Sequence, residues 1–559
     1  MKKLVLIFFL LMLASIRAAS AETIIVNSED WRDVYSSMLY GNLQGITNTH
    51  FLVSRNHGTL ILNQVNPSDE ILAFSSRRNP FIVGYRAVVE SRGFECEETV
   101  YDDFNLELAE ELDEITNFIV IDDSYGYNAI SVAPYAVVSN SYVLFADRNN
   151  IRRIANFLSG RTVDSLIIYG HVNREVLDSL EPYTPEIINK EGDRFYNNIE
   201  ITKKYQAISP STQAVLTNGE FIESEIMSGK QPVLFIGTNN VPDQIKDYIQ
   251  NSEIDIGVLI GNELVGTATT IRRQVGISVF VKFAQGARSP DSAISQVEAL
   301  DMFYLPTYIL NLELDSIKYN RATGMLEVTI RNTEGQAVFF KGTHSLIDSN
   351  GITQTVGDID PIFLEGNSLK TMIYEVQPMA DGKINGDIYI IYGESKNSLE
   401  KALSGTFEVG VIDVLDECEI EITNLVYDKR KKEFHVELKN IVDTKKQITC
   451  YASSEVIDVV VDGFRTTVGS TEVVEIGPGR KAHNIIEVEL SDEDIEENEI
   501  VTVRTSYGQR NNALVRTKER DFELNVKGVD YITFTLILII IILIILILIK
   551  RKKDKEKKH

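Results

Sequence analysis

Two segments in the C-terminal half of the chain repeat one pattern at a fixed distance. SIKYNRATGMLEVTIRN (316–332) and NLVYDKRKKEFHVELKN (424–440) align without a gap at an offset of 108 residues. On both sides of a charged turn, apolar residues alternate with charged ones, which is the period of a strand with one buried face. Each copy therefore predicts a strand, a turn and a second strand. Modules of about a hundred residues with many short strands indicate two tandem immunoglobulin-like β-sandwiches.

The N-terminal half has a different rhythm, in which short apolar runs alternate with helical periodicity. Three segments share a strand, a polar turn with an asparagine, and an amphipathic helix: 71–89, 142–158 and 232–249. The second and third copies continue into another apolar run, at 165–172 and 256–264. Apolar runs of this length between helices are typical of parallel strands that are covered on both faces. We therefore expect three related, Rossmann-like α/β repeats with right-handed crossovers.

Both ends of the chain carry segments that direct it to a membrane. Residues 1–21 combine Lys2 and Lys3, an apolar core and an Ala-Ser-Ala ending, which predicts a cleaved signal peptide. Residues 531–549 contain no charge, and nineteen residues at about 1.5 Å each span roughly 28 Å, enough for a hydrocarbon core. The basic tail 550–559 then predicts a cytoplasmic C-terminus. The sequence thus predicts a single-pass type I protein of the cell membrane with an extracellular ectodomain.

These patterns divide the chain into eight predicted segments. They are a signal peptide (1–21), α/β repeats (22–115, 116–195 and 196–305), β-sandwiches (306–412 and 413–527), a transmembrane helix (531–549) and a cytoplasmic tail (550–559). The formal net charge is −26, and it becomes about −34 for the ectodomain once the positive charges of the two terminal segments are removed. An acidic surface of this size argues against nucleic acid as a partner.

Cysteine is sparse for an exported protein. The chain has three cysteines, so a disulfide scaffold is excluded. Cys418 and Cys450 fall in one predicted sandwich and can form one disulfide, while Cys96 stays unpaired. The alternative is that all three are small buried hydrophobic residues.

No catalytic signature stands out from the sequence. The seven histidines show no zinc-binding spacing, and there is no Gly-x-Ser-x-Gly elbow, no phosphate-binding loop and no Gly-x-Gly-x-x-Gly. We therefore expect a protein that is not an enzyme and holds no cofactor.

The most interesting polar cluster follows the strand that ends at Ile121. Asp122 and Asp123 lie at the carboxyl end of a predicted parallel strand, where open α/β sheets bind ligands, and with Ser124 and Asn128 they could hold calcium. The alternative is that Asp and Ser cap the helix that begins near Asn128. Asn150 and Asn240 follow strands of the second and third copies. These six residues are the candidate polymer- or ligand-binding residues.

Residues 118–180 resemble the cell wall-binding repeat type 2 family. Asn128 to Ala136, NAISVAPYA, stands for the family's Asp-Ala-Leu-Ser-x-x-Pro-Leu-Ala-like helix, and IIYG (167–170) for its closing strand. The first copy shows no counterpart of that helix. The family usually comes in threes, and the resemblance implies a non-catalytic trio that attaches proteins to wall polymers. In the short turn before the helix, we expect Gly126 to make the turn.

Together these features predict a prokaryotic, plausibly archaeal, surface protein. Its α/β head would bind a wall or surface-layer polymer, and the β-sandwiches would act as spacers that hold the head away from the membrane. Two alternatives stay open: an adhesin or receptor-like module that binds an extracellular protein, and an enzyme that modifies envelope polysaccharide.

Overall fold

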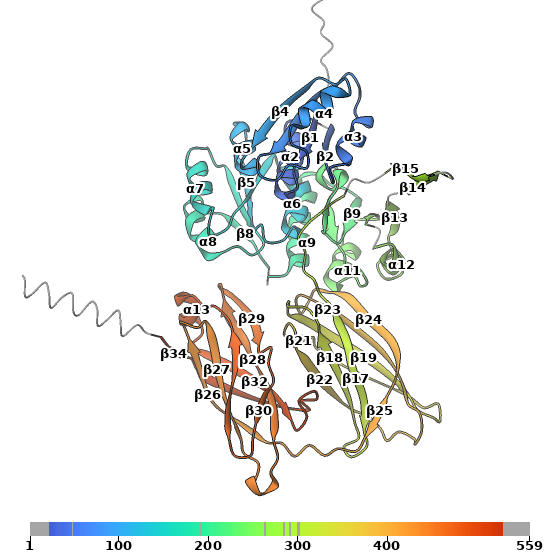
Figure 1. Ribbon diagram of the computed structural model, residues 1–559, viewed down its shortest axis with the longest axis vertical. Coiled ribbons are helices and arrows are strands. Elements are labelled where there is room, and N and C mark those ends of the chain that lie inside the picture. Colours follow the sequence, from blue (N-terminus) through green and yellow to red (C-terminus); the bar gives the residue numbers. More distant parts are fainter. Residues whose placement is uncertain are drawn as a thin grey trace, which may run out of the picture.

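The computed structural model describes residues 22–528, except for 47, 191, 262–263, 283–284, 290–291 and 299–301. Parallel α/β sheets fill the N-terminal half, and β-sheets of mainly antiparallel strands fill the C-terminal half, as predicted (Figure 1). The predicted signal peptide and transmembrane segment lie outside the described residues. Within the described residues, none of the helices has the length and apolar character needed to cross a membrane.

The α/β half contains three four-stranded sheets with one strand order. In each sheet the first strand of the unit lies between the second and the third, the fourth lies beside the third, and all pairs are parallel. The strands, in spatial order, are β2 (Asn48–Phe51), β1 (Glu22–Asn27), β3 (Glu70–Ser76) and β4 (Cys96–Tyr101); β6 (Ser141–Phe145), β5 (Asn117–Ile121), β7 (Ser165–Tyr169) and β8 (Glu186–Ile188); β11 (Val233–Phe235), β9 (Gln213–Thr217), β12 (Ile256–Ile260) and β13 (Ser278–Lys282).

Helices cover these sheets and join the three units. They are α2 (Trp31–Leu43), α3 (His57–Leu60), α4 (Tyr85–Ser91), α5 (Phe104–Glu111), α6 (Tyr127–Val138), α7 (Ile151–Ser159), α8 (Arg174–Leu180), α9 (Arg194–Ile208), α10 (Ser224–Met227), α11 (Asp243–Gln250) and α12 (Val265–Gln274). Helices α2, α6 and α10 follow the first strand of each unit and pack against one another. One continuous apolar core therefore runs through all three units.

The first unit departs from the predicted alignment. Residues 142–158 and 232–249 form the second strand and helix of their units, but 71–89 forms the third strand and helix of its unit. The true counterpart of β6 and β11 is β2, whose four residues NTHF carry too little apolar signal to be recognised. The first unit does have a helix after its first strand, α2, but its sequence WRDVYSSMLYGNL does not carry the Ala-Leu-Ser-like pattern.

The role predicted for Gly126 differs in the structure. Gly126 has φ −76°, an ordinary value that any residue adopts, so no left-handed turn requires glycine here. A Cβ at this position would lie 2.4 Å from a side-chain carbon of Leu305. Gly126 N also donates to Pro306 O at 3.1 Å. Glycine is needed because the chain that leads into the first sandwich crosses closely over the start of α6.

The C-terminal half consists of two β-sandwiches with the same strand order. The first contains β17 (Leu312–Asn320), β18 (Met325–Asn332), β19 (Val338–Ile347), β20 (Thr353–Gly357), β21 (Ile362–Leu364), β22 (Leu369–Glu375), β23 (Asn385–Gly393), β24 (Leu399–Glu408) and β25 (Gly410–Ile412). The second contains β26 (Ile420–Asp428), β27 (Glu433–Asn440), β28 (Cys450–Val461), β29 (Phe464–Gly469), β30 (Val474–Ile476), β31 (Lys481–Glu487), β32 (Ile500–Gly508), β33 (Arg516–Glu523) and β34 (Asn525–Lys527), with a short helix α13 (Asp492–Glu497).

The repeat at offset 108 is a true structural repeat. The pair β17 and β18 has a bulge between Leu314 and Ser316, and β26 and β27 have the same bulge between Ile422 and Asn424. Cys418 and Cys450 form a disulfide, and Cys96 is a buried free thiol. Short two-stranded pairs lie where the α/β half ends: β10 (Phe221–Ile222) with β16 (Phe303–Tyr304), and β14 (Gln285–Ser289) with β15 (Ser292–Glu298).

The two sandwiches lie side by side beneath the α/β half rather than in a line (Figure 1). Lys370 pairs with Glu455 at 2.9 Å between the sandwiches, and Arg510 holds both oxygens of Glu327. The second sandwich returns to the α/β half, where Asp494 pairs with Arg174 at 2.9 Å. This arrangement contradicts the predicted spacer, because the described chain ends at β34 beside α13, close to the α/β half.

Candidate functional site

The aspartates singled out in the sequence make internal contacts. Asp122 Oδ1 accepts a hydrogen bond from Ser124 N at 2.8 Å, which closes a turn after β5. Asp123 forms an ion pair with Arg32 of α2 at 2.5 Å. Neither caps α6, which begins after Gly126 without a side-chain cap, so the capping interpretation is wrong for this helix. The ion pair between Asp123 and Arg32 joins the first unit to the second.

Asp123 and Asn150 line one small pocket of about 200 Å³ between the first two units. Its charged groups face one another: Arg32 also holds Asp30 at 2.6 Å, and Arg153 holds Asp103 at 2.7 Å. Asn150 is engaged in the turn before α7, where its Nδ2 donates to Phe145 O at 2.8 Å. Internal pairing therefore engages Arg32, Arg153 and their carboxylate partners at this junction.

The remaining candidates lie elsewhere. Asn128, in the first turn of α6, packs so closely against Gly170 that a Cβ there would meet the Asn128 amide at 2.4 Å. Asn240 is buried where the α/β half meets the first sandwich, and its Nδ2 donates to Leu399 O at 2.5 Å. The structure thus does not bring the six predicted residues into one site. In the described part of the chain, no cluster of three or more His, Cys, Asp or Glu side chains could hold a metal ion.

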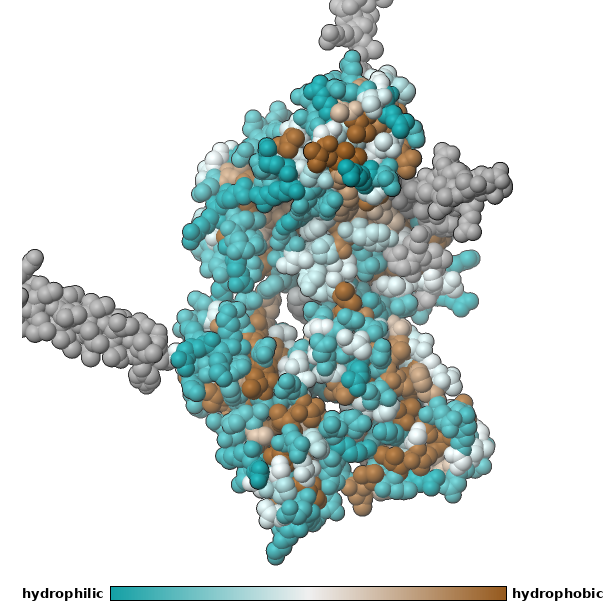
Figure 2. All heavy atoms as spheres, in the orientation of Figure 1, coloured by the Kyte–Doolittle hydropathy of each residue, from teal (hydrophilic) through white to brown (hydrophobic). Residues whose placement is uncertain are grey.

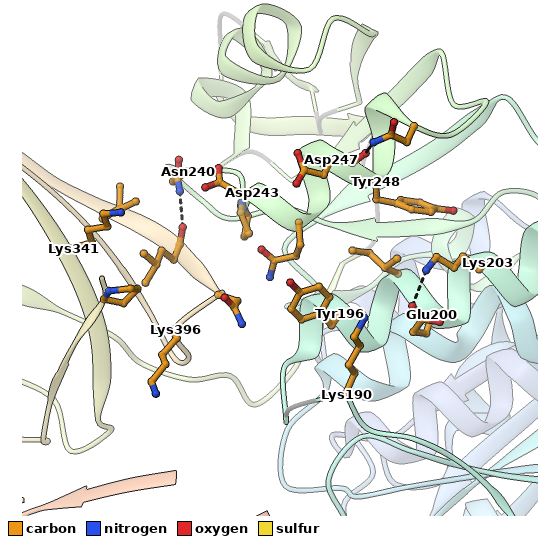
Figure 3. A pocket seen from close by; sticks show the side chains of 18 of the residues that line it. Lys190, Tyr196, Glu200, Lys203, Asn240, Asp243, Asp247, Tyr248, Lys341 and Lys396 are labelled. Carbon is orange, nitrogen blue, oxygen red and sulfur yellow. Dashed lines mark hydrogen bonds and ion pairs between the residues drawn. The ribbon is translucent and has the colours of Figure 1, made fainter. Parts of the chain in front are cut away.

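A larger pocket, here called the junction pocket, opens between the α/β half and the first sandwich. It has a volume of about 720 Å³. Helices α9 and α11 form one wall, and strands β19, β23 and the β23–β24 turn form the other (Figure 3). A pocket of this size between two bodies of one chain is a common place for a ligand. Figure 2 shows that the surface is hollowed where the two halves meet.

A buried ion-pair cluster holds the two walls together. Arg194, at the start of α9, pairs with Glu400 at 2.5 Å and with Glu394 at 3.2 Å, both from the first sandwich. The guanidinium lies over the Tyr127 ring, 3.8 Å from its centroid. Burial raises the pKa of Glu394 to about 8, although the positive charge of Arg194 opposes this shift. Such a cluster fixes the relative positions of the two walls, because separating them would leave buried charges unpaired.

The turn between β23 and β24 is fastened at a second point. Ser395 Oγ and Ser398 Oγ both donate to Asp193 Oδ2, at 2.8 and 2.7 Å. Asp193 is also the N-cap of α9, where its Oδ1 accepts from Phe195 N at 2.8 Å. One carboxylate therefore caps the helix that forms one wall and holds the turn that forms the other.

Three lysines of the junction pocket have no carboxylate partner. Lys190, Lys341 and Lys396 form no ion pair with any residue that the structure describes. Lys190 lies over the Tyr196 ring at 4.7 Å, and Lys396 lies 5.9 Å from the centroid of Phe339. Figure 3 shows Lys190 on one side of the pocket and Lys341 and Lys396 on the other. On a strongly acidic protein, unpaired cations on both walls favour an anionic ligand.

Aromatic and amide groups complete the lining. Tyr389 on β23 is 48% exposed, and Tyr196 and Tyr248 present partly exposed rings from the helices. Such rings can pack against the apolar faces of sugars, while amides, lysines and carboxylates bond to hydroxyl groups. Of the six residues predicted from the sequence, Asn240 lines this pocket and the other five do not. The remaining lining residues were not predicted, although the alternation in NGDIYIIYG (385–393) does predict that Tyr389 faces outward.

Comparison with known proteins gives no family assignment. No family profile and no curated protein matches the chain. Among solved structures, Cwp8 from Clostridium difficile is similar at 18% identity and a TM-score of 0.36, over 46% of this chain and 48% of its own. Red sea bream transglutaminase has 7% identity and a TM-score of 0.13, over 48% and 34%. The periplasmic chaperone SfaE has 11% identity and a TM-score of 0.13, over 39% and 100%. The matched region thus spans about half the length of Cwp8.

Proposed function

We propose that this chain is a non-catalytic cell-surface protein that binds a polymer of the cell wall or surface layer. The observation that carries the proposal is the junction pocket, where tyrosine rings, amides and unpaired lysines line a volume of about 720 Å³. This mixture suits a sugar polymer, because the rings cover apolar sugar faces and the polar groups bond to oxygens. The shared strand order of the three α/β units agrees with the predicted set of related repeats.

The proposal includes the predicted location, which is the cell membrane with an extracellular ectodomain. Segments 1–21 and 531–549 support export and anchoring in the cell membrane. It differs from the sequence-based hypothesis in the role of the sandwiches. They form one wall of the pocket and return the described chain to the α/β half, so they take part in binding instead of acting as spacers.

A sedimentation assay tests this function. Full-length protein in a non-ionic detergent is mixed with envelope polysaccharide from which protein and lipid have been extracted. We expect saturable pelleting that soluble envelope polysaccharide competes away. Protein that stays in the supernatant at all polymer concentrations would contradict polymer binding and favour the alternative of an extracellular protein partner.

A further inference from the structure

The junction pocket is the middle of a longer groove. Toward β8 it continues into an outer hollow of about 540 Å³, with which it shares Lys190, Glu200 and Lys203. Toward the β half it continues into a groove of about 1020 Å³ between the two sandwiches, with which it shares Lys341 and Lys396. The three hollows thus form one path from the α/β half to the space between the sandwiches. A continuous path suits an extended chain better than a single compact molecule.

Two buried amides along this path have a donor without an acceptor. Gln244 of α11 is 9% exposed and lines the junction pocket, and its Nε2 has no hydrogen-bond partner among the described residues. Asn189 lines the outer hollow, and its Nδ2 is likewise unpartnered there. A buried donor without a partner is unfavourable, and a ligand that supplies an acceptor oxygen removes this cost.

The groove contains lysines without a carboxylate partner on both walls of the junction pocket, two unpartnered amide donors, and two carboxylates without an ion pair among the described residues, Asp247 and Asp360. Lys190, Lys341 and Lys396 lack carboxylate partners. Burial raises the pKa of the Asp358 carboxyl, and the charge of the nearby Lys341 opposes this shift without forming an ion pair. Donors and cations without partners fit a ligand that is rich in acceptor oxygens and carries negative charge. The exposed ring of Tyr389 also lines the junction pocket and fits a sugar face.

We propose that the groove binds an extended, acid-substituted polysaccharide. The acid groups would contact Lys190, Lys341 and Lys396, the amides of Asn189 and Gln244 would donate to sugar oxygens, and Tyr389 would stack on a sugar ring. This inference rests on the proposed polymer-binding function and narrows it to one class of polymer and one path. It also gives the first sandwich a direct part in recognition.

The test compares three fluorescently labelled probes by anisotropy, with full-length protein in a non-ionic detergent. The probes are a polygalacturonic acid oligomer, the same oligomer after reduction of its carboxyl groups, and poly-glutamate. We expect binding of the acidic oligomer, a loss of at least about tenfold in affinity on carboxyl reduction, and weaker binding as salt rises. Equal binding of the reduced oligomer would overturn the role of the acid groups. Tighter binding of poly-glutamate would overturn the sugar and indicate an acidic peptide.

Variants locate the binding path. Lys190→Gln, Lys341→Gln and Lys396→Gln together should weaken binding of the acidic oligomer about tenfold. A matched control removes three lysines that do not line the groove, Lys230→Gln, Lys439→Gln and Lys445→Gln, and should leave the affinity within about twofold. Equal losses in the two triple variants would mean that net charge, not the groove, governs binding.

A second variant tests the groove without changing the net charge of the protein. Gln244→Leu removes the unpartnered donor while keeping a similar shape, so it should fold as well as the wild type and bind several-fold more weakly. If both this variant and the triple lysine variant of the groove bind the acidic oligomer with unchanged affinity, the proposed binding path is wrong. If the wild type pellets with envelope polysaccharide but ignores the acidic oligomer, polymer binding stands and only the acidic class fails. If it does neither, the proposed function itself fails.

Discussion

Arg194 on helix α9 and Glu400 on strand β24 form a buried ion pair across the junction between the α/β half and the first sandwich. Their side chains are 7% and 6% exposed and 2.5 Å apart, and they lie 206 positions apart in the chain. Glu394 shares the same guanidinium. This cluster joins two bodies that the sequence presents as separate modules.

Arg194→Met should weaken the junction strongly. Removing one partner of a buried ion pair leaves uncompensated carboxylates and typically costs about 3–5 kcal/mol. We expect the calorimetric transition that contains the junction to move down by about 10 °C. Arg331→Met is the matched control, because Arg331 pairs with Asp315 on the surface of the first sandwich and such pairs contribute less than about 1 kcal/mol. Equal shifts in both variants would show that the buried cluster has no special role.

Gly237→Ala should disturb the same junction by a steric route. A Cβ on Gly237 would lie 2.3 Å from Glu400 O and 2.2 Å from Asn240 O, both backbone atoms that cannot rotate away. We expect faster proteolysis of the β23–β24 turn and lower thermal stability. Gly266→Ala in helix α12 meets nothing within 4 Å and should be neutral or slightly stabilising. A wild-type digestion pattern for Gly237→Ala would argue against tight packing here.

The disulfide should stabilise the second sandwich alone. It closes a separation of 32 residues, for which the loss of chain entropy in the unfolded state predicts about 3–4 kcal/mol. We expect Cys418→Ala with Cys450→Ala to lower only the transition of the second sandwich, as measured by calorimetry. Cys96→Ala, in the first α/β unit, serves as the control. A parallel shift of every transition would contradict an effect confined to one sandwich.

The first sandwich manages without this bond. Register places Leu310 and Val338 at the positions of Cys418 and Cys450. Both are buried in its apolar core. Two apolar side chains thus occupy the place of the bridge.

His344 should make the first sandwich sensitive to acid. The ring is fully buried on β19, and burial lowers its pKa to about 4 from an ordinary value of 6.5. A histidine with a lowered pKa in the folded state contributes stability above pH 6.5 and loses it as the pH falls toward 4. The loss is up to about 3 kcal/mol.

Thermal unfolding measured from pH 7 to pH 4 checks this expectation. His344→Phe keeps a ring beside Tyr374 and should flatten the pH dependence of the first sandwich relative to the wild type. His483→Phe, at an exposed position on β31, should leave it unchanged. Identical slopes for the wild type and His344→Phe would exclude this histidine as the acid-sensitive group.

Much of the β half could be predicted from its repeat. The offset of 108 residues predicts the paired strands β17–β18 and β26–β27, while the bulge that both pairs contain is seen only in the structure. After these strands the second sandwich has four more residues before β28, so the register passes to an offset of 112. The gapless repeat alone therefore did not show that Val338 corresponds to Cys450.

The sequence predicted the α/β class of the N-terminal half, but it did not align the strands of the first unit correctly with those of the other two. Apolar runs identify buried parallel strands, yet β2 is too short and polar to be found this way. Gly126 shows the same limit, since its glycine is required by Leu305, a residue far along the chain. The candidate residues at strand ends were placed correctly at the sheet edge, but internal ion pairs such as Arg32 with Asp123 engage them.

The sequence by itself determined the local order of helices and strands, the two fold classes and the repeats, because hydrophobic periodicity is a property of neighbouring residues. Only the tertiary structure decided that the sandwiches fold back beneath the α/β half and create the groove. That arrangement depends on pairs such as Arg194 with Glu400 and Arg174 with Asp494, whose partners are hundreds of residues apart. The sequence around a charged residue does not show which distant residue of opposite charge will pair with it. The site between the modules was therefore recognised only in the tertiary structure, where both of its walls are present.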